Sequence, residues 1–233
     1  MMLDQIQMVF FDAAGTLFEV QGSVGEIYSR LARGYGVEVA PEEIQRSFAR
    51  QFRAQPPMAF PSETPEAERL ALEREWWRDL VCAVFAGEGA FPRFEEYFTE
   101  VFEFFRRAEG WRLYDDVVPT LAALKARGLR LGIISNFDSR LFDVLRALSL
   151  DHYFEAVHIS SREGAAKPDP AIFEAALIGH DLAPQNALHI GDSLREDVEA
   201  AAAVGMQAIW LDRRDHEENT RLPRITRLNQ LVE

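Results

Sequence analysis

Five short apolar runs recur along the chain, and amphipathic stretches separate them. Four runs are strong, at residues 6–11, 129–135, 187–190 and 206–211, and a weaker one covers residues 156–160. Short apolar runs bounded by small residues suit strands that are buried on both faces of a parallel sheet. The amphipathic stretches predict covering helices, at residues 117–127, 140–148, 171–178 and 194–204. This alternation predicts an α/β fold, a three-layer Rossmann-like parallel sheet.

Residues 21–109 interrupt the alternation, because they contain no convincing strand. Their apolar spacing predicts four helices, at residues 23–35, 41–55, 65–86 and 91–107. We therefore expect a helical module inserted between the first and second strands of a core made of residues 1–20 and 110–233. Its aromatic residues are expected to form the module's own core rather than a ligand cage: Trp76, Trp77, Phe98, Phe102 and Phe105. A last helix is expected at residues 225–232.

Composition excludes several kinds of partner. The formal net charge of −13 over 233 residues argues against nucleic acid, whose phosphates need a basic surface. No apolar stretch has the length of a membrane span, and the N-terminal segment lacks the basic start of a signal peptide. Cys82 is the only cysteine, so no disulfide can form within the chain, which favours a cytoplasmic location. Its apolar surroundings predict a buried thiol.

Polar residues follow the predicted strands at their carboxyl ends, where parallel α/β sheets bind ligands. Asp12 follows the first run, Ser135 and Asn136 end the second, and Asp192 follows residues 187–190. Two further groups lie close by: Lys167 before Pro168, and Asp197, five residues after Asp192. We expect all of them at one rim of the sheet.

This set of residue types suits phosphoryl chemistry. Carboxylates such as Asp12 and Asp192 are hard oxygen ligands of the kind that Mg²⁺ prefers. The metal and Lys167 would offset the charge of a phosphate, and Ser135 with nearby N–H groups would hold its oxygens. Asp12 could then attack phosphorus and form an aspartyl-phosphate. Lys125 and Lys167 are the only lysines, which favours a chemical reason for Lys167.

Four segments in this order resemble the motifs of the haloacid dehalogenase superfamily. They are Phe10-Phe11-Asp12-Ala13-Ala14-Gly15-Thr16-Leu17, Ile133-Ile134-Ser135-Asn136, Lys167-Pro168-Asp169-Pro170, and Gly191-Asp192-Ser193 with Asp197. The helical insertion resembles the C1 cap of that superfamily. The segment Ser135-Asn136-Phe137-Asp138, with Arg53-Ala54-Gln55 and Trp76-Trp77, most resembles the subgroup of haloacid dehalogenase-like hydrolase domain-containing protein 3.

The resemblance implies roles for individual residues. Asp12 is implied as nucleophile and Mg²⁺ ligand, with the main-chain carbonyl of Ala14 and the carboxylate of Asp192 as further ligands. Asp197 is implied as support for the metal or for Lys167, which shares the catalytic role with Asp12. The implied phosphate-binding residues are Thr16, Ser135, Asn136 and Lys167.

One position departs from the family pattern. Phosphatases of the family carry a second Asp as general acid and base where this chain has Ala14, and such proton transfer is worth about 10²- to 10⁴-fold in rate. A good leaving group, as in an acyl or aryl phosphate, would need no acid. Alternatively Glu19 or Asp138 could substitute, although a solvated loop acid or, for Asp138, a helix N-cap is favoured for both.

The expected function is a Mg²⁺-dependent phosphatase acting on a small phosphorylated metabolite through an aspartyl-phosphate. Two alternatives remain open. Ala14 also suits a non-catalytic protein that binds a phosphorylated ligand, or a metal-free 2-haloacid dehalogenase. The sequence leaves the substrate and the oligomeric state undetermined.

Overall fold

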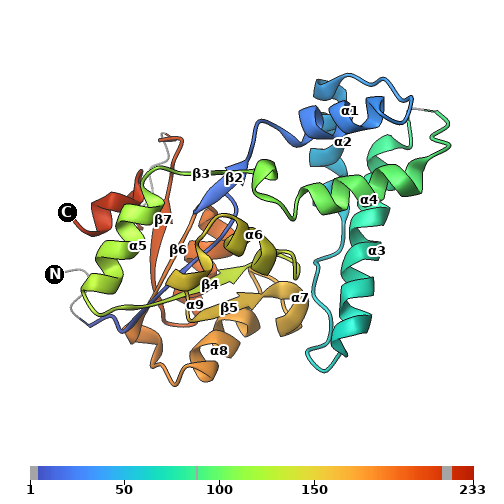
Figure 1. The fold of residues 1–233 in the computed structure, drawn as a ribbon. Helices are drawn as coiled ribbons and strands as arrows, with labels where there is room; N and C mark the ends of the chain where they lie inside the picture. The colour runs from blue at the N-terminus through green and yellow to red at the C-terminus, as the bar shows by residue number, and fades with distance from the viewer. Residues whose placement is uncertain (1–4, 88, 217–221) are drawn as a thin grey trace.

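A six-stranded parallel sheet lies between helices in the larger part of the protein (Figure 1). The computed structural model describes residues 5–87, 89–216 and 222–233. The strand order is β5-β4-β1-β6-β7-β8. The strands are β1 (Met8–Phe11), β4 (Arg130–Ser135), β5 (Ala156–Ile159), β6 (Ala187–Gly191), β7 (Gln207–Leu211) and β8 (Arg224–Ile225). Five of them match the five apolar runs, because a strand buried on both faces has little room for polar side chains.

Alternate residues of β1 enter two separate hydrophobic cores. Val9 and Phe11 pack with α5 (Val117–Ala126) and α6 (Leu141–Ala147) on one face of the sheet. Met8 and Phe10 pack with α8 (Pro170–Gly179) and α9 (Ala200–Ala203) on the other. Because side chains alternate across a strand, one short run supplies both cores. The expected three-layer α/β architecture is confirmed.

Four helices lie to one side of these layers (Figure 1). They are α1 (Val24–Arg33), α2 (Pro41–Ala54), α3 (Glu66–Phe85) and α4 (Phe94–Phe104), as the apolar spacing predicts. They share a third hydrophobic core that includes Ile27, Ile44, Leu80 and Tyr97. The division of the chain at residues 21 and 109 stays a prediction.

A short antiparallel ribbon joins the helices to the sheet. The strand β2 (Phe18–Val20) pairs with β3 (Trp111–Leu113), so that Val20 lies opposite Trp111. The chain leaves towards α1 after β2, and it returns through the 3₁₀ turn η1 (Ala108–Gly110) into β3. The sequence analysis missed this ribbon, because strands of three residues carry almost no periodicity.

Two other expectations are wrong. The predicted last helix is instead β8, followed by the 3₁₀ turn η5 (Leu228–Leu231), because the segment from Pro223 to Ile225 hydrogen-bonds along the edge of β7. Cys82 is exposed on α3 rather than buried. The helix predicted at 194–204 begins as a π-helical segment, η4 (Leu194–Glu199), and continues as α9.

The remaining short elements connect the layers. They are α7 (Ser160–Glu163), η2 (Asp151–Tyr153) and η3 (Pro184–Asn186). Within the described ranges, none of the helices combines the length and the apolar character that crossing a bilayer requires.

Candidate active site

The predicted rim is assembled from the ends of three neighbouring strands. β1 lies between β4 and β6, so Asp12 after β1, Ser135 at the end of β4 and Asp192 after β6 come together. The Asp12 amide donates to the carbonyl of Ile190 at 2.9 Å, which extends the ladder up to the site. Adjacent parallel strands end at the same edge, and a ligand can meet all three there.

Asp12 is held by two donors on one oxygen. Its Oδ1 accepts hydrogen bonds from Lys167 Nζ at 2.6 Å and from Ser135 Oγ at 2.9 Å. Lys167 Nζ also donates to Asp197 Oδ1 at 2.5 Å, and the ammonium group is almost fully buried. The lysine therefore lies between two carboxylates, which neutralise its buried positive charge.

Asn136 fixes the backbone that carries the lysine. Its Oδ1 accepts from the Lys167 amide at 2.7 Å, and its Nδ2 donates to the Lys167 carbonyl at 2.9 Å. This reciprocal pair orders the segment before Pro168, although the two residues are far apart in the chain. Asn136 also lines the cavity described below. Its contact with a phosphate stays a prediction.

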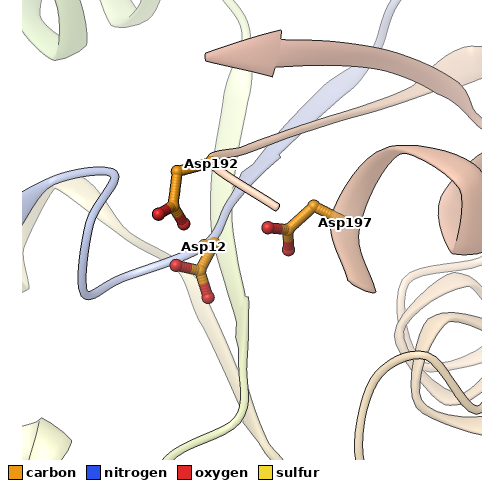
Figure 2. A group of neighbouring side chains, drawn as sticks. All are labelled: Asp12, Asp192 and Asp197. Carbon is orange, nitrogen blue, oxygen red and sulfur yellow. The ribbon is translucent and has the colours of Figure 1, made fainter. Parts of the chain in front are cut away.

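Three carboxyl groups face one another at the rim (Figure 2). One oxygen of each of Asp12, Asp192 and Asp197 lies within 4.8 Å of the others. Two glycines make this approach possible. A Cβ on Gly15, whose φ is +91°, would lie 2.5 Å from Asp192 Oδ2, and one on Gly191 would lie 2.1 Å from the Asp197 carboxyl carbon. Only glycine, which has no Cβ, fits at these two positions where the carboxylates converge.

The charges at the rim do not balance. Three carboxyl groups gather at the rim, and the ammonium of Lys167 binds two of them, so a divalent cation would neutralise the excess negative charge. Lost hydration, with the charges of Asp12 and Asp197, raises the pKa of Asp192 to about 7, even though its side chain is open to the cavity. Burial also raises the pKa of Asp12 against the opposing effect of Lys167. Carboxyl groups whose negative charge is not balanced offer the oxygen ligands that a hard cation binds.

Asp197 is the carboxylate that stays ionised. Burial alone would raise its pKa, but Lys167 and His189 hold the pKa of Asp197 below its ordinary value. His189 Nε2 lies 3.0 Å from Asp197 Oδ1, and the Ser193 amide donates to Oδ2 at 3.0 Å. Burial lowers the pKa of His189, so a neutral ring donates through Nε2–H. These bonds hold the Asp197 carboxylate in a place where it can position the ammonium group of Lys167.

A cavity of about 710 Å³ opens onto the rim. Asp12, Ala14, Ser135, Lys167 and Asp192 line one side, and aromatic side chains of the four helices line the other. Cavities of this size hold small-molecule ligands in many proteins. The five aromatic residues assigned to the helical core belong to it or pack against it, as expected, and all five also line this cavity: Trp76, Trp77, Phe98, Phe102 and Phe105.

Neither substitute acid is part of this cavity. Asp138 is fully buried, and it accepts from Arg140 Nε at 2.9 Å and from Trp77 Nε1 at 2.6 Å. Burial would raise the pKa of Asp138, but Arg140 holds it below its ordinary value, so this carboxyl is not a proton donor near neutral pH. Glu19 on β2 pairs with Arg112. Neither Asp138 nor Glu19 is among the described residues that line the cavity.

Thr16 lies apart from the other predicted phosphate-binding residues. It is fully buried, and its hydroxyl has no hydrogen-bond partner within the described ranges. Thr16 is absent from the described residues that line the cavity, whereas its carbonyl accepts from Arg213. Its role in phosphate binding stays a prediction.

Two residues of the site were not found from the sequence. Glu196 lines the cavity, its Oε2 lies 3.5 Å from Asn136 Nδ2, and burial raises its pKa. The acidic pair Glu196-Asp197 after a strand end was the available signal. Trp210 on β7 donates from Nε1 to the Asp192 carbonyl at 3.0 Å, which fixes the loop. Its apolar strand gave no sign of this contact.

Comparison with known proteins agrees with this geometry. Residues 6–205 match the family model described as haloacid dehalogenase-like hydrolase. The human protein named haloacid dehalogenase-like hydrolase domain-containing protein 3 is 34% identical over 206 residues, which cover 88% of this chain and 81% of the relative.

Two solved structures have the same fold. The "HAD phosphatase" from Thermococcus onnurineus is 24% identical with a TM-score of 0.68, and the alignment covers 97% of this chain and 96% of the other. The "2-Haloacid Dehalogenase" from Pseudomonas syringae pv. Tomato DC3000 is 27% identical with a TM-score of 0.66, over the same shares. Proteins named for two different activities thus share this architecture, so the choice between the activities rests on the residues of the site.

Proposed function

This chain belongs to the haloacid dehalogenase-like hydrolase family, and from that premise we propose that it is a Mg²⁺-dependent phosphohydrolase. Its substrate is a small phosphorylated molecule, and the reaction passes through an aspartyl-phosphate on Asp12. The single observation that carries the proposal is the convergence of Asp12, Lys167 and Asp192 at one end of the cavity. A nucleophile, a cation and a further carboxylate then face the same ligand.

The residues fit Mg²⁺ as the metal. Asp12, Asp192 and the carbonyl of Ala14 would hold it, and these residues share the cavity wall. Gly15 supports the fit, because the close approach of Asp192 depends on the absence of a side chain there. When bound, Mg²⁺ supplies positive charge that offsets the phosphate dianion and orients one of its oxygens.

In the first step, a carboxylate oxygen of Asp12 attacks phosphorus. Lys167 and Ser135 both bind Oδ1, whereas Oδ2 accepts no hydrogen bond within the described ranges, so we assign the attack to Oδ2. The new bond joins Oδ2 to phosphorus as the ester P–O bond breaks, and the electron pair leaves with the alcohol oxygen. Lys167 and Ser135 keep the carboxylate oriented throughout.

In the second step, water attacks phosphorus and the bond to Oδ2 breaks. This step releases inorganic phosphate and restores the Asp12 carboxylate, while the proton of the water leaves with phosphate or solvent. Position 14 supplies no proton donor, because its side chain is a methyl group. The chemistry therefore favours leaving groups that depart without protonation.

The test is the variant Asp12→Asn assayed on acetyl phosphate with Mg²⁺. We expect kcat/KM to fall by at least roughly a thousandfold, because the amide is a poor nucleophile. A matched control is Asp181→Asn, which changes an exposed Asp at φ 53°, a conformation that Asn accepts well. Equal activity of the Asp12→Asn variant and the unmodified protein would overturn the proposal.

A 2-haloacid dehalogenase is the second candidate, favoured by Ala14 and by the likeness to the Pseudomonas syringae structure. Halide release from a 2-haloacid in EDTA would support it. The clustering of Asp192 with Asp12 favours the metal-dependent reaction, because neighbouring carboxylates are the ligands that a hard cation binds. If metabolite phosphates bind in calorimetry without release of phosphate, the chain is instead a non-catalytic binding protein.

A further inference from the structure

We infer that the helical wall of the cavity binds an aromatic leaving group, so that the substrate class is an aryl phosphate monoester. This inference rests on the proposed function and specifies its substrate. The observations that carry it are the aromatic composition of the wall, the hydrogen bonds that already satisfy its indole N–H groups, and the lack of a carboxyl group among the described residues on that side.

Aromatic rings make up much of the wall opposite Asp12. They come from all four helices of the insertion and include Phe52 of α2, Trp76 and Trp77 of α3, and Phe98 and Phe102 of α4. The rings support one another edge to face. The ring centroids of Trp76 and Trp77 are 5.1 Å apart at 72°, and those of Phe52 and Trp76 are 5.9 Å apart at 83°. Such arrangements are favourable, and they fix the rings before a ligand arrives.

The two indole N–H groups of this wall are already used within the protein. Trp76 Nε1 donates to the carbonyl of Pro56 at 2.9 Å, and Trp77 Nε1 donates to Asp138 Oδ2 at 2.6 Å. What the two indoles offer to a ligand is therefore apolar ring surface. Phe52 is 46% exposed and lines the cavity, so part of its ring is open to a ligand.

Within the described ranges, the helical wall also provides no carboxyl group. Among its described residues, the charged group is Arg53, and all of the cavity's carboxyl groups lie on the sheet side. With no described carboxyl group on this side to protonate it, a leaving group bound there departs best if it is stable as an anion. A phenol has a pKa of about 10, like tyrosine, so phenolate is a far better leaving group than the anion of an alkyl alcohol. The P–O(aryl) bond breaks as Asp12 attacks, the electron pair stays on the phenolate oxygen, and solvent protonates it afterwards.

These two requirements lead to the same ligand. The wall favours a flat apolar ring on the side of the scissile bond that faces away from Asp12. The chemistry favours a phenolic oxygen as the leaving atom. An alkyl phosphate satisfies neither requirement, and acetyl phosphate satisfies only the chemical one. The three substrates therefore separate the contribution of the ring from that of the leaving group.

The experiment compares phenyl, ethyl and acetyl phosphate with Mg²⁺. We expect kcat/KM for phenyl phosphate to exceed that for ethyl phosphate by at least about a hundredfold, the lower range of acid catalysis that is missing here. In Trp76→Leu, the ratio of kcat/KM for phenyl phosphate to that for acetyl phosphate should fall by about two- to tenfold, as stacking contributes that much. Phe52→Leu, at a half-exposed position, gives the same test if Trp76→Leu fails to fold.

The matched control is Ile178→Ala, which removes an exposed apolar side chain of α8 outside the described lining of the cavity. It should leave the ratio unchanged. Equal kcat/KM on phenyl and ethyl phosphate, or an unchanged ratio in both wall variants, would overturn the inference. The proposed function would still stand if hydrolysis of acetyl phosphate depended on Asp12.

A binding measurement separates the inference from catalysis altogether. Phenylphosphonate and methylphosphonate cannot be hydrolysed, and tryptophan fluorescence reports their binding. We expect phenylphosphonate to bind at least about tenfold more tightly, because the wall removes the ring from water. Equal dissociation constants would overturn the inference. If acetyl phosphate were also inert, the proposed function would fail as well, whereas the phosphonate comparison would still decide what the wall binds.

Discussion

At the scale of single residues, Gly15 and Gly191 decide whether the carboxylates can meet. Gly15 has a left-handed φ, and its missing Cβ leaves room for Asp192. Gly191 gives the same room to Asp197. The two glycines therefore do more than permit a turn, because they allow three charges to share one small volume.

Replacing Gly15 tests this requirement. Gly15→Ala should lower the affinity for Mg²⁺ by about 10- to 100-fold, as displaced ligands do in metal sites. Gly36→Ala is the matched control, since Gly36 also has a positive φ but has open space around the added methyl group. Both variants carry similar backbone strain, so calorimetric titration with Mg²⁺ isolates the effect on Asp192. The same affinity in both variants would contradict this interpretation.

At the scale of elements, Asp138 and Arg140 join three helices. Trp77 of α3 donates to Asp138, and Arg140 at the start of α6 donates to the Phe102 carbonyl of α4 at 3.2 Å. The guanidinium also lies over the rings of Trp77 and Phe102. The buried pair thus holds α3 and α4 against the end of β4, beside the site.

Asp138→Asn should destabilise the protein by about 3–5 kcal/mol, because it leaves the buried charge of Arg140 unpaired. The native pKa of Asp138 lies below its ordinary value of 3.8, so its contribution is present above that pH and is lost as the pH falls through the native pKa. The unmodified protein should therefore lose stability below about pH 4, and the difference between the two proteins should shrink there.

Urea denaturation across pH 2–7 would measure both effects. Asp143→Asn is the control, because its pairs with Arg106 and Arg146 are partly exposed and worth at most about 1 kcal/mol. A variant as stable as the unmodified protein at pH 7 would contradict the assigned role of the pair.

The sequence predicted the elements that repeat a pattern and missed those that do not. Apolar runs gave five strands, and helical spacing gave the four helices of the insertion. The ribbon β2–β3 and the strand β8 are too short to show a period. The same limit applies within the site. Strand ends located Asp12 and Asp192, but the position of Asp138 depends on Arg140 and Trp77, which only the tertiary structure brings together.

The aromatic residues show a second limit. A ring at an apolar helical position packs into a core in most proteins, and the sequence pattern favours that reading for Trp76 and Phe98. In this protein the same rings support the helical core and line the cavity. Periodicity locates the face of a helix, but it cannot distinguish a wall of packed side chains from a wall with space beyond it.

At the scale of the whole molecule, the protein is strongly acidic and concentrates part of that charge at one rim. Mg²⁺ at about 100 times its dissociation constant stabilises a folded protein by about 2.7 kcal/mol. For a chain of this length, the melting temperature should therefore rise by roughly 5–10 °C. Asp192→Asn should lose this rise, and its melting temperature without Mg²⁺ should equal or exceed that of the unmodified protein because one clustered charge is gone. Thermal melts in Mg²⁺ and in EDTA measure both, and an undiminished rise in the variant would contradict Asp192 as a ligand.

The pairing of Val20 with Trp111 has a consequence for modularity. The two ends of the helical insertion stand opposite each other in an antiparallel ladder, which is where a tight hairpin turn would otherwise be placed. Excising everything between them and closing the gap with a two-residue turn leaves both strands in register. In topological terms the helical insertion joins the sheet at two adjacent points, so a different insertion could be connected there if it also supplied partners for Asp138 and Arg140.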